Sequence, residues 1–150
     1  MPTAGPFKLK VMLFCGQHTA IGPGKADLLE AIEQGGSITA AARAMGMSYR
    51  RAWTLVATMN RSWTKPLVET SMGGGGRGGA SLTAFGKHLL TGYRALESDL
   101  MRYAATSPFS AWADDLLNEP RPQETQDHRR KSAADLSVPA RPKTLQSGSQ

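Results

Sequence analysis

The stretch GSITAAARAMGMSYRRAW, residues 36–53, has the pattern of two short helices joined at a glycine. Ser37 is a favourable N-cap for the first helix, because its hydroxyl can accept a hydrogen bond from a backbone N–H of the first turn. Gly46 ends that helix, since a sharp turn favours a residue that tolerates a positive φ. Ser48 then caps a helix over 48–63. The stretch therefore predicts a pair of helices joined by a tight turn.

Further elements flank this pair. The alternation of apolar residues with lysine in FKLKVMLF predicts a half-buried strand over 7–14. Two short strands, LVETS and ASLT, are separated by glycine-rich sequence that cannot be helical, so they predict a hairpin whose tip, the wing, covers 72–80. The remaining predicted elements are a helix over 25–34, a long helix over 84–104 and a short amphipathic helix over 109–117.

The order of these elements is that of a winged helix-turn-helix, a mainly α fold with a small β-hairpin. In such folds the first helix of the pair packs across the second, and the second enters the major groove of DNA. The alanines at 40–42 and 44 permit this close packing. The wing can reach an adjacent minor groove, where the negative potential attracts an arginine such as Arg77.

Positive charge is concentrated in the same part of the chain. The whole sequence has a formal net charge of +6 and a pI of about 9.8, which favours an anionic partner. Between residues 43 and 94 the only acid is Glu69. The cations of this segment are Arg43, Arg50, Arg51, Arg61, Lys65, Arg77, Lys87 and Arg94.

Two stripes of the helix over 48–63 compete for burial. The longer one is aliphatic, so we expect it to face the core; it comprises Ala52, Leu55, Val56, Met59 and Trp63. The other contains Tyr49, Trp53 and Asn60, and Trp53 could alternatively pack against the first helix of the pair. The expected DNA contacts are Ser37, Ser48, Tyr49, Arg50, Arg51, Trp53, Thr54, Lys65 and Arg77.

The long helix over 84–104 also carries a dimerisation signal. Its apolar side chains alternate at spacings of four and three, as in a coiled-coil seam. The predicted dimer contacts are Leu89, Tyr93, Leu96, Leu100 and Tyr103. Alternatively, the closing helix covers this seam with Phe109, Trp112 and Leu116. A homodimer would place two helices on successive major grooves, so we expect an inverted-repeat operator.

Composition divides the chain near Glu119. The domain is predicted over 1–118, and the Pro-, Ser- and Arg-rich remainder over 119–150 predicts a disordered basic tail. No apolar run approaches a membrane span of about 18 residues, and no signal peptide is recognisable. The lone Cys15 is expected to be a buried residue in a reducing compartment, because free cysteines are usually buried. The predicted location is cytoplasmic.

Two segments together resemble a known family. GSITAAARAMGMSYRRAWTLVATMN, followed by PLVETSMGGGGRGGASLTAFGKHLL, is similar to the DNA-binding domain of ModE-type molybdate-responsive repressors, which are relatives of the LysR-type winged helices. The resemblance covers about residues 24–104 and implies a dimeric, sequence-specific transcriptional regulator. Arg51 stands where that family tends to have a small residue, and the tail is too short for an oxyanion-binding domain. The resemblance thus implies DNA binding without molybdate sensing.

Other classes of function have weaker support in the sequence. GPGK at 22–25 lacks the spacing of a phosphate loop. The histidines lie far apart, so we expect no metal site and no cofactor. No nucleophile–base pattern or carboxylate pair is present, so we expect no catalytic residues and no enzyme activity. The alternative to a DNA-binding regulator is a protein- or RNA-interaction module on a winged-helix scaffold.

Overall fold

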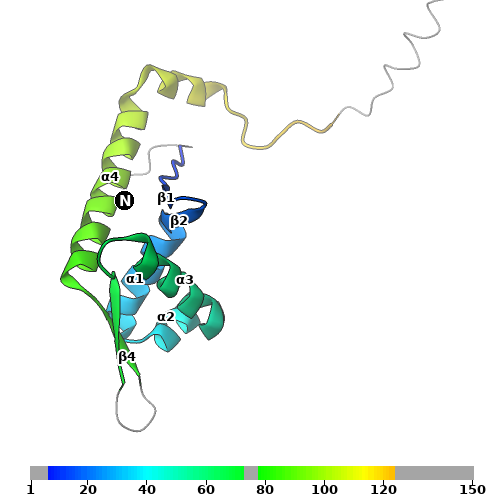
Figure 1. The fold of residues 1–150 in the computed structure, drawn as a ribbon. Helices are drawn as coiled ribbons and strands as arrows, with labels where there is room; N and C mark the ends of the chain where they lie inside the picture. The colour runs from blue at the N-terminus through cyan, green and yellow to red at the C-terminus, as the bar shows by residue number, and fades with distance from the viewer. Residues whose placement is uncertain (1–6, 73–77, 124–150) are drawn as a thin grey trace, which may run out of the picture. The chain divides into compact units, whose positions relative to one another are not determined.

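The computed structural model describes residues 7–72 and 78–123 and separates two units, Met1–Asp115 and Leu116–Gln150. The helices and strands of the described residues all belong to the first unit (Figure 1). They are β1 Leu13–Cys15, β2 His18–Ile21, α1 Pro23–Gly35, α2 Ile38–Ala44, α3 Tyr49–Ser62, β3 Val68–Ser71, β4 Gly79–Leu82, α4 Ala84–Thr106 and the 3-10 helix η1 Pro108–Asp115. None of the helices in these residues is long and apolar enough to cross a membrane.

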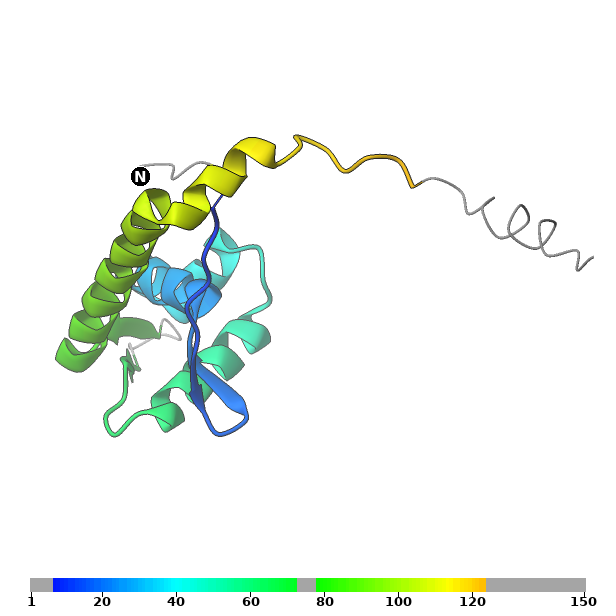
Figure 2. The same ribbon diagram turned by 90° about the horizontal axis from the view of Figure 1, so that it is seen from above.

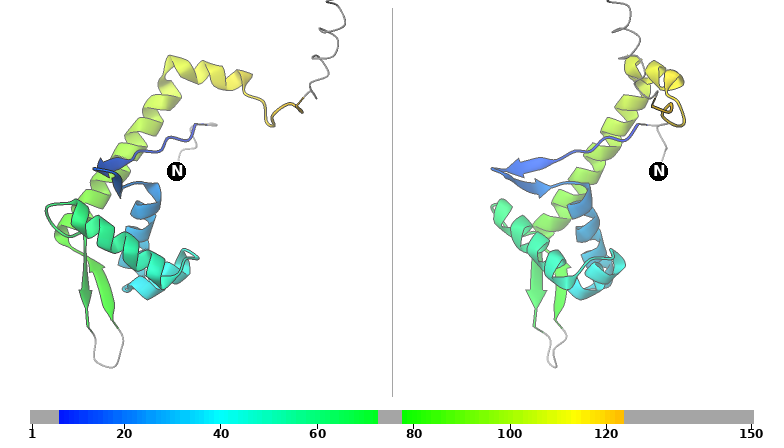
Figure 3. Two further views of the ribbon diagram at one scale, coloured as in Figure 1. Left: turned by 45° about the vertical axis from the view of Figure 1, so that its right-hand side comes forward. Right: turned by 90° about the vertical axis from the view of Figure 1, so that its right-hand side faces the viewer.

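The core forms where α1, α2 and α3 meet the β3–β4 hairpin. Its largest fully buried side chains come from β2, α1, α3 and the residue before β3, and are Ile21, Leu28, Leu29, Ile32, Met59 and Leu67. α1 is the central helix, with α3 and α4 on opposite sides of it (Figure 2). The β1–β2 and β3–β4 hairpins lie at opposite ends of this helical body (Figure 3). The arrangement confirms the predicted winged helix-turn-helix.

The turn between α2 and α3 has the predicted local chemistry. The Ser37 hydroxyl accepts a hydrogen bond from the Ala40 N–H at 3.0 Å, and the Ser48 hydroxyl accepts one from the Arg51 N–H at 3.1 Å. Gly46 adopts a φ of 64°. Each signal acts within a few residues of its own position, which is why the sequence placed both helices correctly.

The β3–β4 hairpin is fixed to the helices through backbone groups. Its strands are antiparallel and pair Val68 with Leu82. The Ala80 N–H donates to the Gly36 carbonyl at 2.8 Å, which ties β4 to the end of α1. A Cβ on Gly86 would overlap the Leu67 carbonyl oxygen, so this close approach of α4 to the start of β3 requires glycine. The base of this hairpin is therefore held against the helices. Of the predicted tip over 72–80, residues 73–77 lie outside the described residues, and Gly79 and Ala80 belong to β4.

The predicted strand over 7–14 is wrong in extent. Only Leu13–Cys15 is a strand, and it pairs with β2 through a turn at Gly16, whose φ is 59°. Alternation alone cannot make a strand without a hydrogen-bonding partner. The Val11 carbonyl instead accepts a hydrogen bond from the Tyr93 hydroxyl at 2.8 Å. Cys15 is exposed rather than buried, because every residue of β1 is exposed.

The predicted dimerisation seam divides into two parts along α4. Leu89 is partly buried against the core and Tyr93 is buried in it, so both side chains contribute to the fold of the single chain. Beyond this point α4 extends past α1, and the side chains lose that cover. Leu96 is 43% exposed and Tyr103 is 72% exposed, while Leu100 is half-buried.

The closing segment differs from the amphipathic α-helix expected over 109–117. It is a 3-10 helix, and Phe109 and Trp112 are exposed. Phe109 lies 6.0 Å from the ring of Phe7, measured between ring centres. Thus η1 contacts the N-terminal segment, while Leu116 already belongs to the second unit. The predicted tail is described only as far as Gln123, without helix or strand.

Candidate nucleic-acid interface

α3 exposes a mixed aromatic and cationic face. Tyr49 is 55% exposed and Trp53 is 52% exposed, so Trp53 is not packed away against α2. Arg50, Arg51 and Thr54 are also exposed. The opposite side of the helix is buried through Ala52, Val56 and Met59, as the aliphatic stripe predicted. The turn and the buried stripe together fix which face of α3 meets the solvent.

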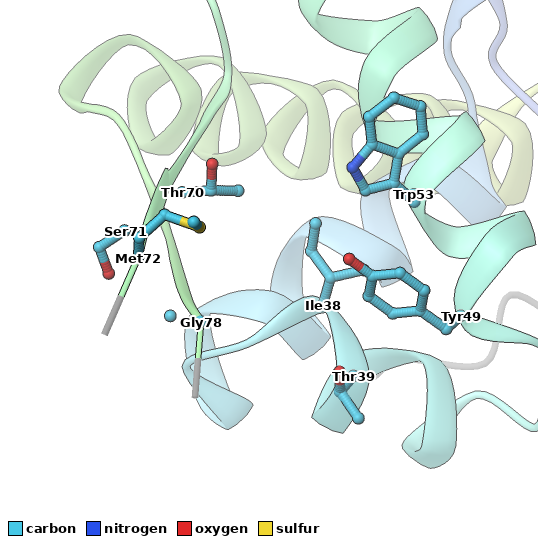
Figure 4. Close-up of a pocket in the computed structure, with 9 residues that line it drawn as sticks. Ile38, Thr39, Tyr49, Trp53, Thr70, Ser71, Met72 and Gly78 are labelled. Atoms are coloured by element: carbon cyan, nitrogen blue, oxygen red, sulfur yellow. The ribbon is translucent and has the colours of Figure 1, made fainter. Parts of the chain in front are cut away.

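A hollow of about 450 Å³ separates this face from the wing. Tyr49 and Trp53 project into it from α3, and Thr70 and Met72 project toward them from β3 and the residue after it (Figure 4). Thr39 of α2 lines its floor. The space is bounded by hydroxyls, aromatic rings and the backbone of Gly79, a lining that can contact both the sugar–phosphate chain and base edges.

The cations of the chain fall into two groups. Arg43, Arg50, Arg51, Arg61 and Lys65 are exposed on α2, α3 and the following loop. Within residues 7–72 and 78–123 none of them takes part in an ion pair. This leaves their charge available to an anionic partner.

The second group lies on the α1–α4 side and is paired with acids. Arg94 contacts Asp27 at 2.5 Å, and Glu30 and Glu97 at 2.8 Å each. Lys87 lies 3.7 Å from Glu33. Lys87 and Arg94 therefore contribute little positive charge to a surface that could bind an anion. Fewer cations are available for such a surface than the number of basic residues between 43 and 94 indicated.

The remaining predicted DNA contacts differ in what their side chains already bind. Ser37 and Ser48 use their hydroxyl oxygens as helix caps, which leaves each O–H able to donate to a phosphate. The Thr54 hydroxyl donates to the Arg50 carbonyl at 2.8 Å. Lys65 is exposed in the loop between α3 and β3, and Arg77 lies outside the described residues.

Asn60 has a role that sequence reasoning missed. Its side-chain oxygen accepts hydrogen bonds from the N–H groups of Leu67 and Val68 at 2.9 and 3.0 Å, and its amide donates to the Val68 carbonyl at 2.8 Å. It is a connector between α3 and the base of the wing, not part of the exposed stripe. The available signal was an amide in the last turn of a helix just before a predicted strand.

Comparison with known proteins agrees with this geometry. Residues 25–87 match the bacterial regulatory helix-turn-helix proteins of the lysR family. The chain is 41% identical over 95 residues to the molybdenum transport protein ModE of Azotobacter vinelandii, covering 63% of this chain and 35% of that one. It is 42% identical over 82 residues to the molybdenum-pterin-binding protein MopA of Rhodobacter capsulatus, covering 55% of this chain and 31% of that one.

A third relative is named as a regulator. The DNA-binding transcriptional dual regulator ModE of Escherichia coli K12 is 37% identical over 93 residues, which cover 62% of this chain and 34% of that one. The chain thus spans about a third of the length of the curated relatives it matches. The resemblance to ModE-type regulators is confirmed for this segment, whose residues 25–87 match the helix-turn-helix domain of the lysR family.

Proposed function

We propose that this protein is a sequence-specific, double-stranded DNA-binding transcriptional regulator that acts without catalysis. The observation that carries the proposal is the exposed face of α3, where Arg50 and Arg51 lie beside Tyr49 and Trp53 with no acidic partner in the described part of the chain. The match to regulatory helix-turn-helix proteins supports it. Such a regulator works in the cytoplasm, where its DNA is.

The proposed contacts of α3 follow from the chemistry of the major groove. Arg50 donates two hydrogen bonds to the edge of a guanine, the commonest specific contact there. Tyr49 or Trp53 contacts a thymine methyl group or a phosphate. Arg51 and Thr54, which lie on the same exposed face, complete the set from this helix.

The hollow between α3 and the wing fits one strand of the duplex. If α3 occupies the major groove, the wing lies over the adjacent minor groove and the intervening backbone passes between them. Ser37, Ser48 and Lys65 are proposed to hold phosphates along this path. Arg77, from the wing over 72–80, is proposed to contact the minor groove, where a narrow channel attracts arginine.

The proposed assembly is a homodimer that binds an inverted repeat. The exposed second half of the α4 seam supports it, with Leu96 and Tyr103 on the surface and Leu100 half-buried between them. Two-fold pairing would set the two copies of α3 about one or two helical turns of DNA apart.

Selection of bound duplexes from a random pool, followed by binding measurements on the winner and a scrambled duplex, tests the proposal. We expect the selected site to bind at least about 10³-fold more tightly than the scrambled duplex. Both affinities should fall steeply between about 50 and 200 mM salt, because phosphate contacts release counterions. No enriched sequence, or tighter binding to RNA or to a protein, would favour the interaction module instead.

A further inference from the structure

A further cavity is lined by Arg51 of α3 and by Met45 and Met47, which flank the turn of the helix-turn-helix. Its volume is about 270 Å³. Its apolar walls come from the N-terminal segment, the α2–α3 turn and α3, through Met12, Met45, Met47 and Leu55. Among the proposed DNA contacts in the described residues, Arg51 alone lines it, so the cavity adjoins the surface described above at this residue.

The apolar walls are adaptable. Met45 and Met47 flank Gly46 in the turn and are half-buried, and Met12 is exposed at the edge of the cavity. Methionine side chains are flexible and polarizable, so they adjust to the shape of an apolar guest. A guest here would contact the turn that sets the angle between α2 and α3.

The polar part of the lining is cationic. Lys25 lines the cavity and its ammonium group donates a hydrogen bond to the Thr19 carbonyl. Lys25 is half-buried, and this burial lowers the pKa of its ammonium group. Arg51 lines the same space, and no carboxylate does so in the described residues. Two cations without a nearby acid favour an anion.

We propose that this cavity binds a small organic anion, a monocarboxylate on a compact apolar body, and that the bound carboxylate draws Arg51 away from DNA. The volume lies just below the usual range for ligand pockets, which favours a single ring or a short branched chain. An inorganic oxyanion could use Lys25 and Arg51 but not the methionine walls, so a carboxylate on an apolar body fits the whole lining better. The proposal has a binding half, that the cavity holds the anion, and a regulatory half, that the bound anion draws Arg51 away from DNA. The regulatory half rests on the proposed function, whereas the binding half does not.

Binding is tested on the full chain without DNA, by NMR of 13C-labelled methionine methyl groups. The probe is cyclohexanecarboxylate, and its amide is the uncharged match. We expect the methyl signals of Met12, Met45 and Met47 to shift, with a dissociation constant of about 1 mM for so small a ligand. The buried Met59 and the α4 residue Met101, which do not line the cavity, should not shift.

Matched variants separate the charge from the apolar contact. Arg51→Gln should weaken binding of the carboxylate about fivefold or more and leave binding of the amide unchanged. Arg61→Gln removes the same charge from the same helix, outside the cavity, and should have no effect. Equal binding of acid and amide, equal effects of both variants, equal shifts with sulfate, or no shift at about 10 mM would overturn the proposal.

The regulatory half is tested at constant ionic strength on the duplex selected above. Saturating cyclohexanecarboxylate should weaken DNA binding by the wild type and leave binding by Arg51→Gln unchanged. Methyl shifts with no change in DNA affinity would refute the regulatory half. A protein without affinity for any duplex would instead refute the proposed function, and the NMR result would stand apart from it.

Discussion

Arg50 and Arg51 of α3 and Arg94 of α4 carry the same charge in opposite surroundings. Arg50 and Arg51 project from an exposed helix face and form no ion pair in the described residues, whereas Arg94 is held by Asp27, Glu30 and Glu97. The first pair is available to an external anion. Arg94 connects α1 to α4, and its partners are carboxylates of the same chain. A count of basic residues cannot tell an arginine that is free to bind an external anion from one that is paired within the chain. The side chains around each arginine in the folded structure distinguish the two.

These contacts also determine the ionisation of the side chains between α1 and α4. The hydrogen bond with Glu30, followed by those with Glu97 and Asp27, raises the pKa of Arg94, which stays charged at every relevant pH. Burial, followed by the negative charge of Glu97, raises the pKa of the adjacent Tyr93, whose hydroxyl donates to Val11. This side of the domain therefore serves to hold α4 in place, whereas the α2–α3 side is the one that we propose to recognise DNA.

The largest expected effect concerns the exposed end of α4. Replacing Leu96 and Leu100 together by lysine should convert a dimer into a monomer and reduce affinity for the inverted repeat by about 100-fold or more, because each half-site then binds alone. Sedimentation and DNA titration measure the two effects. Lysines at Ala95 and Ser98, both exposed on α4, are the charge-matched control. A wild type that is monomeric at micromolar concentration, or a double variant that stays dimeric, would remove this seam from the account.

The connector between α3 and the wing should have the next largest effect. Asn60→Ala leaves the backbone groups of Leu67 and Val68 without their side-chain partner, and should lower the free energy of unfolding by about 2–3 kcal/mol. Urea denaturation measures this loss. Asn60→Asp keeps the acceptor for the Leu67 and Val68 N–H groups but sets a carboxylate oxygen against the Val68 carbonyl, so it should also be less stable than the wild type. An alanine variant as stable as the wild type would show that these hydrogen bonds do not support the hairpin.

Arg94→Ala should lower the free energy of unfolding by a smaller amount, about 1–2 kcal/mol, because the network is partly exposed to solvent. DNA affinity measured well below the melting temperature should change less than twofold, since this side does not face DNA in the proposed complex. Arg102→Ala breaks only the exposed pair with Asp99 and serves as the control. A large loss of DNA affinity in the folded Arg94→Ala protein would contradict the division into two sides.

The smallest effect is expected at the wing. Arg77→Ala should reduce the slope of log affinity against log salt by about 1 and leave the preferred sequence unchanged, as for the loss of one phosphate or minor-groove contact. Titrations of the selected duplex at several salt concentrations measure the slope. Unaltered binding would reduce the glycine-rich tip to a connector between β3 and β4.

Local chemistry explains what the sequence predicted. The effects of three residues are local to the turn in which each one stands: Ser37, Gly46 and Ser48. The positions of both helices could therefore be predicted from the sequence. The aliphatic stripe of α3 was also readable, because burial follows helical period. These features were enough to predict the winged helix-turn-helix and the exposed face with Tyr49 and Arg50.

Features that depend on distant partners could not be read in this way. The extent of β1 depends on pairing with β2, and the burial of Tyr93 depends on α4 packing beside the N-terminal segment. The pairing of Arg94 with α1 connects residues more than sixty positions apart. Asn60 was placed on the wrong face because its role depends on where β3 begins. Spacing alone carries no information about such contacts.

Binding of the selected duplex by Arg50→Ala and Arg102→Ala, compared side by side, tests the central claim most directly, since each variant removes one arginine and one charge. We predict that Arg50→Ala costs about 1–3 kcal/mol, or about 5- to 150-fold in affinity, and relaxes preference at one base pair. Arg102→Ala should change affinity less than about twofold. Equal weakening by Arg50→Ala on every sequence would make Arg50 a phosphate contact, and equal loss in both variants would contradict the claim that the α3 face recognises DNA.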